Sequence, residues 1–427
     1  MTTTAPVQSC PGLTASLSRR TLLRGLGIAG GAALASALVP AHVAFADPGS
    51  PATDTLVVLF LRGAADWLSI LPPVGDPAYA AARPTIAVPA SRALPLDAMF
   101  GLHPAMGPLL PFWQSGAMGF VHAVGSPDPT RSHFEAQTAI ELGAFDGRGM
   151  SSGWLDRYLV AVGGGGGLQA VQRGQTLPLS LGGPAPAVAL GSLQSFSITG
   201  APGAGYPAAM AGMYAGITHP LAAQAADTFG ALGAVKAITA SSYAPANGAV
   251  YPTGGTGPAL QDLARLIKAG VGLRLATLDV GNWDMHQGLG AHGAVDGGWM
   301  QGNLVDLAGS LAAFATDLGT AMAGVTVVTV PDFGRRGGEN GSGGVDHGHG
   351  QAMLLLGGGT RGGKVHGSWP SLAPAALDRG DLAGTTDIRS VFGELLADRM
   401  GLTDAGVRAV FPGWTPAYLD HTAPRPG

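Results

Sequence analysis

Three continuous apolar runs constrain the possible folds of this chain more than any other feature. Their sequences are LVVLFL at 56–61, VTVVTV at 325–330 and AMLLLG at 352–357. Short runs of this kind are typical of strands that are buried on both faces. The 70 glycines and 32 prolines approach a low-complexity composition, but the chain is also 46% hydrophobic with a net charge of only −4. Disordered chains combine low hydrophobicity with high net charge, so we expect a folded core.

Strands and helices alternate along most of the chain. This alternation predicts an α/β fold in which helices cover both faces of a mostly parallel sheet, a three-layer αβα sandwich. One Gly-rich segment, 147–220, departs from the alternation and is expected to be an insertion or cap. The expected helices span 104–115, 133–142, 258–270, 299–322 and 387–400, and further strands span 119–125 and 273–280.

The first 46 residues have the pattern of an export signal. Arg19 and Arg20 precede an apolar segment at 26–39, and Ala44-Phe45-Ala46 forms an A-x-A cleavage site. The adjacent arginines resemble a twin-arginine (Tat) signal, which exports proteins already folded, often with a metal or cofactor loaded. We therefore expect a mature domain of residues 47–427 in the periplasm, cell envelope or extracellular space, with the Tat translocase as a transient partner. An uncleaved membrane anchor is the competing interpretation.

Charge and cysteine content exclude several classes of function. Without residues 1–46 the chain carries 20 basic and 27 acidic residues, and it has no basic block. A nucleic-acid surface needs clustered positive charge, so no nucleic-acid partner is expected. The single cysteine, Cys10, lies in the signal. Disulfide scaffolds, cysteine zinc sites and cysteine nucleophiles are therefore excluded.

Acidic and imidazole side chains gather at the ends of the predicted strands. The segment 279–286 follows one strand, the segment 331–335 follows another, and 346–349 (DHGH) precedes a third. Sites in open α/β sheets form at the carboxyl ends of strands. Carboxylates and imidazoles without thiolates suit Zn, Mn, Mg or Ca, and histidine favours the transition metals. The alternative is that these are solvated turn residues.

A second group of polar residues lies at 130–135, where a strand is followed by a helix. Ser132 and Glu135 fit an S-x-x-E capping box. Ser132 is also a candidate nucleophile, since a helix N-terminus attracts an anionic substrate, and Arg131 and His133 support that interpretation. Arg62 ends the first strand and could hold an anion or a site carboxylate.

The chain resembles a known family through long, ordered motifs from about residue 54 to 412. The motifs are LVVLFLRGAADWL, GLHPAMGPLLPFW, VHAVGSPDPTRSHFEAQ, GWLDRYL, GNWDMH, PDFGR, GVDHGHG and TTDIRSVFGELL. They resemble DUF1501, a family of twin-arginine-exported bacterial proteins without a well-established activity. That family is similar to the alkaline phosphatase/sulfatase superfamily, which hydrolyses phosphate or sulfate esters with bound metal ions. The resemblance implies an alkaline phosphatase-like fold.

The superfamily pattern can be carried onto this sequence residue by residue. It implies Ser132 as the nucleophile. The implied metal ligands are His286 together with either Asn282 or Asp284, and Asp332. A further histidine ligand is implied at His347, with His349 as the alternative. Two positions depart from the pattern. Phe333 stands where a metal-binding histidine is expected, and Arg62 stands where an aspartate is expected, unless Asp66 takes that role or serves instead as a helix cap. These departures argue against a full two-metal site and leave one metal ion or none.

Two functions are compatible with these residues. The first is an exported, metal-dependent hydrolase that acts on a small-molecule or glycan ester of phosphate or sulfate. The second is a non-catalytic cell-envelope binding protein on the same fold. A dinucleotide-dependent oxidoreductase is a weaker third, because no G-x-G-x-x-G follows the first strand.

Overall fold

A computed structural model describes residues 54–145, 149–164, 166–198 and 205–425 of the chain. Every described residue belongs to one compact unit, Ala44–Gly427. The predicted export signal, residues 1–46, lies outside the described residues. No helix among the described residues is long and apolar enough to cross a membrane.

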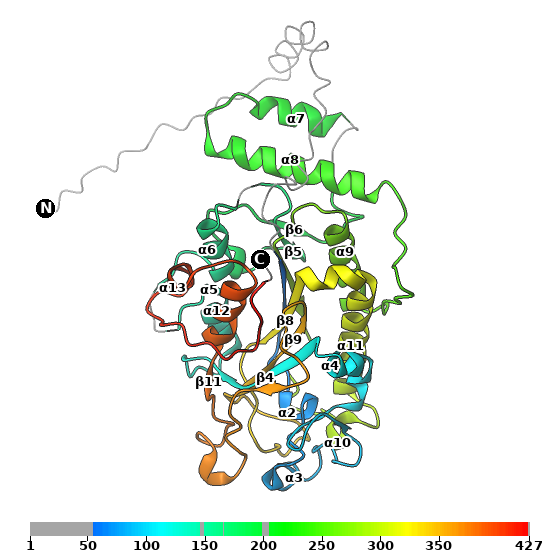
Figure 1. Ribbon diagram of the computed structural model, residues 1–427, viewed down its shortest axis with the longest axis vertical. Helices are drawn as coiled ribbons and strands as arrows, with labels where there is room; N and C mark the ends of the chain where they lie inside the picture. The colour runs from blue at the N-terminus through cyan, green and yellow to red at the C-terminus, as the bar shows by residue number, and fades with distance from the viewer. Residues whose placement is uncertain (1–53, 146–148, 165, 199–204, 426–427) are drawn as a thin grey trace, which may run out of the picture. The chain divides into compact units, whose positions relative to one another are not determined.

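A nine-stranded sheet forms the centre of the described unit (Figure 1). Its order is β10–β4–β9–β8–β1–β7–β5–β6, and β11 pairs with β4. The three apolar runs form β1, β8 and β9, which lie side by side in the middle of this order. Only β9 runs antiparallel to its neighbours β4 and β8 within the described sheet, so the predicted mostly parallel sheet is confirmed.

The strands have the following bounds. The large sheet contains β1 (Thr55–Leu61), β4 (Met118–Gly125), β5 (Ala170–Arg173), β6 (Val188–Leu190), β7 (Leu275–Val280), β8 (Val325–Pro331), β9 (Gln351–Gly357), β10 (Val365–His366) and β11 (Thr386–Asp387). A separate antiparallel pair consists of β2 (Leu94–Pro95) and β3 (Gly101–Leu102).

Helices cover both faces of the sheet, with α5, α6, α12 and α13 on one side and α9 and α11 on the other (Figure 1). The α-helices are α2 (Trp67–Ile70), α3 (Pro77–Ala82), α4 (Leu110–Gln114), α5 (His133–Leu142), α6 (Trp154–Ala161), α7 (Tyr206–Tyr214), α8 (Pro220–Thr239), α9 (Thr256–Lys268), α10 (Ala291–Ala294), α11 (Trp299–Leu318), α12 (Ile388–Asp398) and α13 (Asp404–Val410). Short 3-10 segments span Pro104–Leu109, Leu179–Leu181, Gly319–Gly324 and Pro374–Ala376.

Successive side chains of β1 point to opposite faces of the sheet, so this strand packs against both helix layers. Leu56, Val58 and Phe60 join the core cluster that includes Trp154 of α6 and Phe392 of α12. The intervening residues of β1 are equally buried and face the opposite layer. Because both faces must be apolar, a continuous run replaces the alternating pattern of a half-exposed strand.

The Gly-rich segment 147–220 does not form a separate insertion throughout. Its strands β5 and β6 extend the central sheet beyond β7, and all three run parallel. Each strand is short and flanked by glycine or proline, so its apolar pattern is weak in the sequence. The expectation of an insertion without regular α/β structure is therefore wrong for this part of the segment.

The end of the chain is anchored by one buried carboxylate of α12. Glu394 is 2% exposed and accepts hydrogen bonds from the backbone N–H groups of Leu419 (2.5 Å), Asp420 (3.0 Å), His421 (2.5 Å) and Thr422 (2.8 Å). Burial opposes its ionisation, but His421 and these N–H groups lower the pKa of Glu394 from 4.5 to about 2. The native state therefore favours the ionised carboxylate.

This anchor predicts a stability loss in acid. The pKa of Glu394 is depressed by folding, so its contribution is fully present above about pH 4.5 and disappears as the pH falls towards 2. Glu394→Gln should lower the free energy of unfolding at pH 7 by about 2–3 kcal/mol and flatten its dependence between these pH values. Denaturant unfolding across this range measures both effects. Asp420→Asn is the control, because its carboxylate is 75% exposed in a surface ion pair and should change stability by less than about 1 kcal/mol.

Candidate metal centre

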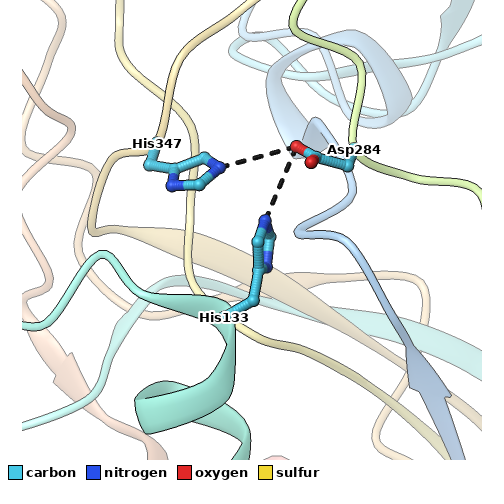
Figure 2. Close-up of side chains that lie close together, drawn as sticks. All are labelled: His133, Asp284 and His347. Carbon is cyan, nitrogen blue, oxygen red and sulfur yellow. Dashed lines mark ion pairs between the residues drawn. The ribbon is translucent and has the colours of Figure 1, made fainter.

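Three side chains from distant parts of the chain converge at the carboxyl ends of the central strands. His133 begins α5, Asp284 follows β7, and His347 precedes β9. Figure 2 shows both imidazoles directed at the Asp284 carboxylate. The Nε2 atoms of His133 and His347 each lie 3.5 Å from Asp284 Oδ1. One potential ligand atom from each residue lies within 4.8 Å of the others.

A fourth donor, His286, approaches the same point. Its Nε2 lies 3.2 Å from Asp284 Oδ1 and 2.8 Å from His347 Nε2. Zinc ligands at 2.0–2.1 Å in a tetrahedron stand about 3.3 Å apart. The spacing of these nitrogen and oxygen atoms therefore suits a single small cation.

The other ring nitrogen of each histidine faces an acceptor. His133 Nδ1 lies 2.5 Å from Asp332 Oδ2, His286 Nδ1 lies 3.0 Å from Asp346 Oδ1, and His347 Nδ1 lies 2.7 Å from the Arg131 carbonyl. A neutral imidazole that donates from Nδ1 carries a lone pair on Nε2, and metal-binding histidines are oriented in this way. The lone pairs of His286 and His347 repel each other at 2.8 Å unless a cation or a proton lies between them.

His133 supplies a further sign that a ligand belongs here. Its Nε2 atom is buried and has no hydrogen-bond partner among the described residues. Phe333 stacks on the His133 ring at 4.7 Å and lies 4.8 Å from the ring of His347, so two imidazoles are packed against one aromatic wall. Phe333 thus occupies the position where the sequence pattern expects a histidine, and His133 of α5 contributes an imidazole instead.

Neighbouring charges set the protonation of the donors. The hydrogen bond to Asp332 raises the pKa of His133. Burial, with the positive charge of Arg335 in addition, lowers the pKa of His347. Burial opposes ionisation of Asp284, but its hydrogen bond and ion pair with Arg335 and the nearby histidines hold the pKa of this carboxyl below its usual range. An ionised carboxylate beside a neutral His347 is therefore ready to bind a cation.

Arg335, which was not among the predicted site residues, organises the loops around this centre. Its side chain has no exposed surface and donates to Asp284 Oδ1 at 2.7 Å. It also donates to the carbonyls of Gly63 (2.6 Å), Ala64 (2.7 Å) and Val345 (3.1 Å). The guanidinium thus ties the end of β1 to the loops that carry Asp284 and His347. The only available signal was its place in the PDFGR motif at the end of a strand.

Asp332 and Asp66, both expected as metal ligands, are held in other contacts. Asp332 is fully buried, and its Oδ2 accepts from His133 Nδ1 and from Gly63 N at 2.9 Å. Asp332 therefore orients His133, a candidate metal ligand, and is not itself placed as one. The two carboxylate oxygens of Asp66 accept from Arg83 at 2.6 and 3.0 Å, and Asp66 does not cap α2 with its side chain.

Three other predicted residues also have structural partners or lie at the surface. Arg62 pairs with Glu141 and with Asp279 at 2.8 Å, which leaves little of its charge for a substrate anion. His349 Nε2 lies 2.9 Å from the Ser126 carbonyl. Asn282 is exposed with a left-handed backbone (φ 70°).

Ser132 occupies the N-cap position of α5, but its hydroxyl makes no capping hydrogen bond. Glu135 accepts instead from Thr130 Oγ1 at 2.5 Å. The predicted capping box is therefore wrong. Arg131 pairs with the buried Asp381.

The profile of one family, described as a protein of unknown function (DUF1501), matches residues 101–410. No curated protein and no solved structure matches the chain.

The close approach of β1 to the Asp284 loop predicts a strict requirement for glycine at position 63. Gly63 has a φ of +106°, and a Cβ atom there would lie 2.6 Å from Asp284 N. Gly63→Ala should lower the free energy of unfolding by about 2 kcal/mol or more, through backbone strain and steric overlap. Gly281→Ala, at the end of β7, is a matched control with no atom within 4 Å of the added Cβ. Equal stability of the two variants in urea unfolding would contradict this account.

Proposed function

The chain belongs to the DUF1501 family, and from its site we propose that it is a metal-dependent hydrolase of phosphate or sulfate esters. The observation that carries this proposal is the convergence of the Nε2 atoms of His133, His286 and His347 on Asp284 Oδ1. Donors dominated by imidazole favour zinc or another transition metal over Mg or Ca. When bound, one such ion would polarise the ester and stabilise developing negative charge.

The exposure of the centre supports a catalytic rather than a purely structural role. The Asp284 side chain is 46% exposed and that of His286 is 43% exposed, whereas structural metal sites are closed. A substrate can therefore reach the Asp284 and His286 side chains from solvent.

Two arginines on one carboxylate are candidates for binding the anionic group. Asp381 is fully buried and pairs with both Arg131 and Arg336, whose side chains are partly exposed. The three residues carry a net positive charge, and the backbone carbonyl of Arg131 contacts His347 Nδ1 at 2.7 Å. Positive charge at this position would attract a phosphate or sulfate ester and offset charge in the transition state.

Ser132 is the candidate nucleophile. It precedes His133 at the N-terminus of α5, where backbone N–H groups and the helix dipole favour an anion. Its hydroxyl is not engaged in capping. In this scheme the Ser132 oxygen attacks the phosphorus or sulfur atom, the ester bond breaks, and the proton lost by Ser132 is balanced by protonation of the leaving alcohol. Water then hydrolyses the seryl ester, which releases phosphate or sulfate and regenerates Ser132.

The proposal extends to the fold and to export. A mostly parallel sheet covered on both faces, with the centre at the carboxyl ends of its strands, fits the alkaline phosphatase-like architecture that the motifs imply. Arg19, Arg20 and the A-x-A sequence support export through the Tat translocase, followed by action in the periplasm, envelope or extracellular space.

One observation favours a second candidate, a non-catalytic envelope binding protein. Arg335 already neutralises Asp284 at 2.7 Å, so the cluster could be maintained as a metal-free network of ion pairs and imidazoles. Such a protein would bind no divalent metal tightly, which separates the two candidates.

Metal binding is the first test of the hydrolase. After chelation, the purified protein should bind about one zinc ion, measured by elemental analysis, and gain about 2.7 kcal/mol of stability at a zinc concentration 100 times Kd. His347→Ala should lose this gain. His292→Ala should retain it, because that histidine is exposed and pairs with Asp296. A protein that takes up no metal, with a melting temperature unchanged by Zn, Mn, Mg or Ca, would favour the binding protein.

Hydrolysis is the second test. A panel of phosphate monoesters, phosphate diesters and sulfate esters should reveal turnover that requires the added metal. Ser132→Ala and His347→Ala should each lower kcat by at least about 100-fold, as expected for loss of a nucleophile or of the metal centre. Turnover unchanged in both variants would refute the assigned roles.

A further inference from the structure

One buried amide lies at the start of the strand that follows His347 in the chain. Gln351 begins β9 and is 1% exposed, yet neither its side-chain oxygen nor its nitrogen has a hydrogen-bond partner among the described residues. Buried polar side chains are nearly always hydrogen-bonded, so an amide of this kind marks a place where a polar contact belongs.

The strand register identifies the facing residue. β8 pairs antiparallel with β9, with Val328 opposite Leu355. The paired residues end at Val328 and Leu355, and extending their register to the strand ends sets Asp332 against Gln351. The backbone hydrogen bond from Gly334 N to the His349 carbonyl (2.9 Å) agrees with this register, which shifts by one residue at the Arg335–His347 bridge that follows. Directly opposed residues of an antiparallel pair share a face, with Cβ atoms about 4.5–5.5 Å apart.

The shared face is the one covered by α5. Val328 and Val330 of β8 and Met353 and Leu355 of β9 all belong to the core cluster on that side. Asp332 continues this alternation, and its Oδ2 bonds His133 at the start of α5. The strand register thus assigns Gln351 and Asp332 to the same face of the sheet, the face on which Asp332 contacts His133.

Asp332 presents a matching unused atom. Its Oδ2 accepts from His133 and Gly63, but its Oδ1 is buried without a hydrogen-bond partner among the described residues. An ionised carboxylate accepts hydrogen bonds, and an amide nitrogen donates them. The two orphaned groups are chemically complementary.

We propose that Gln351 is a positioning residue of the metal centre, whose amide donates to Asp332 Oδ1 directly or through one water and so aligns Asp332 behind His133. The inference rests on the proposed metal centre. Gln351 itself contacts no metal and no substrate. It acts through a chain of contacts in which Asp332 orients the His133 ring and the ring presents Nε2 to the ion. Outer contacts of this kind typically change metal affinity by about 10–100-fold.

Zinc affinity, measured by competition with a chelator, tests the proposal on the full protein. Gln351→Met removes the donor at nearly constant volume and should weaken zinc binding by about 10–100-fold. Asp332→Asn should weaken it as well. In the Asp332→Asn background, Gln351→Met should cause no further loss, because its route to His133 is already broken.

Gln172→Met is the matched control. Gln172 is also a buried strand amide of the central sheet, but it contacts Thr277 and Asp279. The Gln172→Met substitution should leave zinc affinity unchanged even if it lowers the melting temperature. Gln351→Leu provides a second variant of different shape should the methionine variant fail to fold, with the same expected loss.

The outcomes separate this inference from the proposed function. A wild-type protein that binds no zinc refutes the metal centre, and the inference falls with it. A wild-type protein that binds zinc with an affinity unaffected by Gln351→Met overturns the inference alone. Equal losses from Gln351→Met in the wild-type and Asp332→Asn backgrounds also overturn it, because they would show that Gln351 does not act through Asp332.

Discussion

The candidate site depends on one buried guanidinium. Arg335 has no exposed side-chain surface, and it donates to Asp284 and to carbonyls at the end of β1 and in two loops. A buried charge costs several kcal/mol unless it is paired and fully hydrogen-bonded. The loops carrying Asp284 and His347 must therefore approach β1 closely enough to satisfy it. That requirement brings together donor atoms from segments more than 50 residues apart in the chain.

Close approach also explains the glycines of the segment 334–350. A Cβ atom at Gly334 would lie 1.8 Å from the Gly350 carbonyl oxygen, and one at Gly344 would lie 2.4 Å from the His286 carbonyl carbon. These glycines let backbone pack on backbone at the strand ends. Dense packing around the centre therefore accounts for Gly334, Gly344, Gly348 and Gly350, whereas an added Cβ at Gly341 or Gly343 would have no atom within 4 Å.

A charged residue at a strand end can belong to a functional site or to a structural ion pair, and the sequence alone did not distinguish the two. Only 12% of residues are charged, so charged residues at strand ends stand out as candidates for a site. Asp284 belongs to the cluster, whereas Asp66 and Arg62 are held by Arg83 and Glu141. Asp284, Asp66 and Arg62 each form an ion pair with an oppositely charged side chain. Which side chain that is depends on contacts between distant segments of the chain.

Local patterns predicted elements well where local forces dominate. The apolar runs gave β1, β8 and β9, and the helix predicted at 133–142 is α5, because strand burial and helix periodicity are properties of short segments. The helix predicted at 104–115 begins instead as a 3-10 segment, since Pro108 inside it has no N–H for an α-helical hydrogen bond. The antiparallel direction of β9 was not predicted, because a strand's apolar run carries no information about its direction.

The sequence by itself determined the family, the buried strands of an α/β fold, and the kinds of side chain that gather at their ends. These follow from motifs, hydrophobic period and residue chemistry, which are all local. Only the tertiary structure decided which side chains meet. It placed His133 with Asp284 and His347 and put Asp332 behind His133. The reason is physical: a histidine offers Nε2 to a cation only when an acceptor holds its Nδ1, and here those acceptors come from segments about 60 to 220 residues away in the chain.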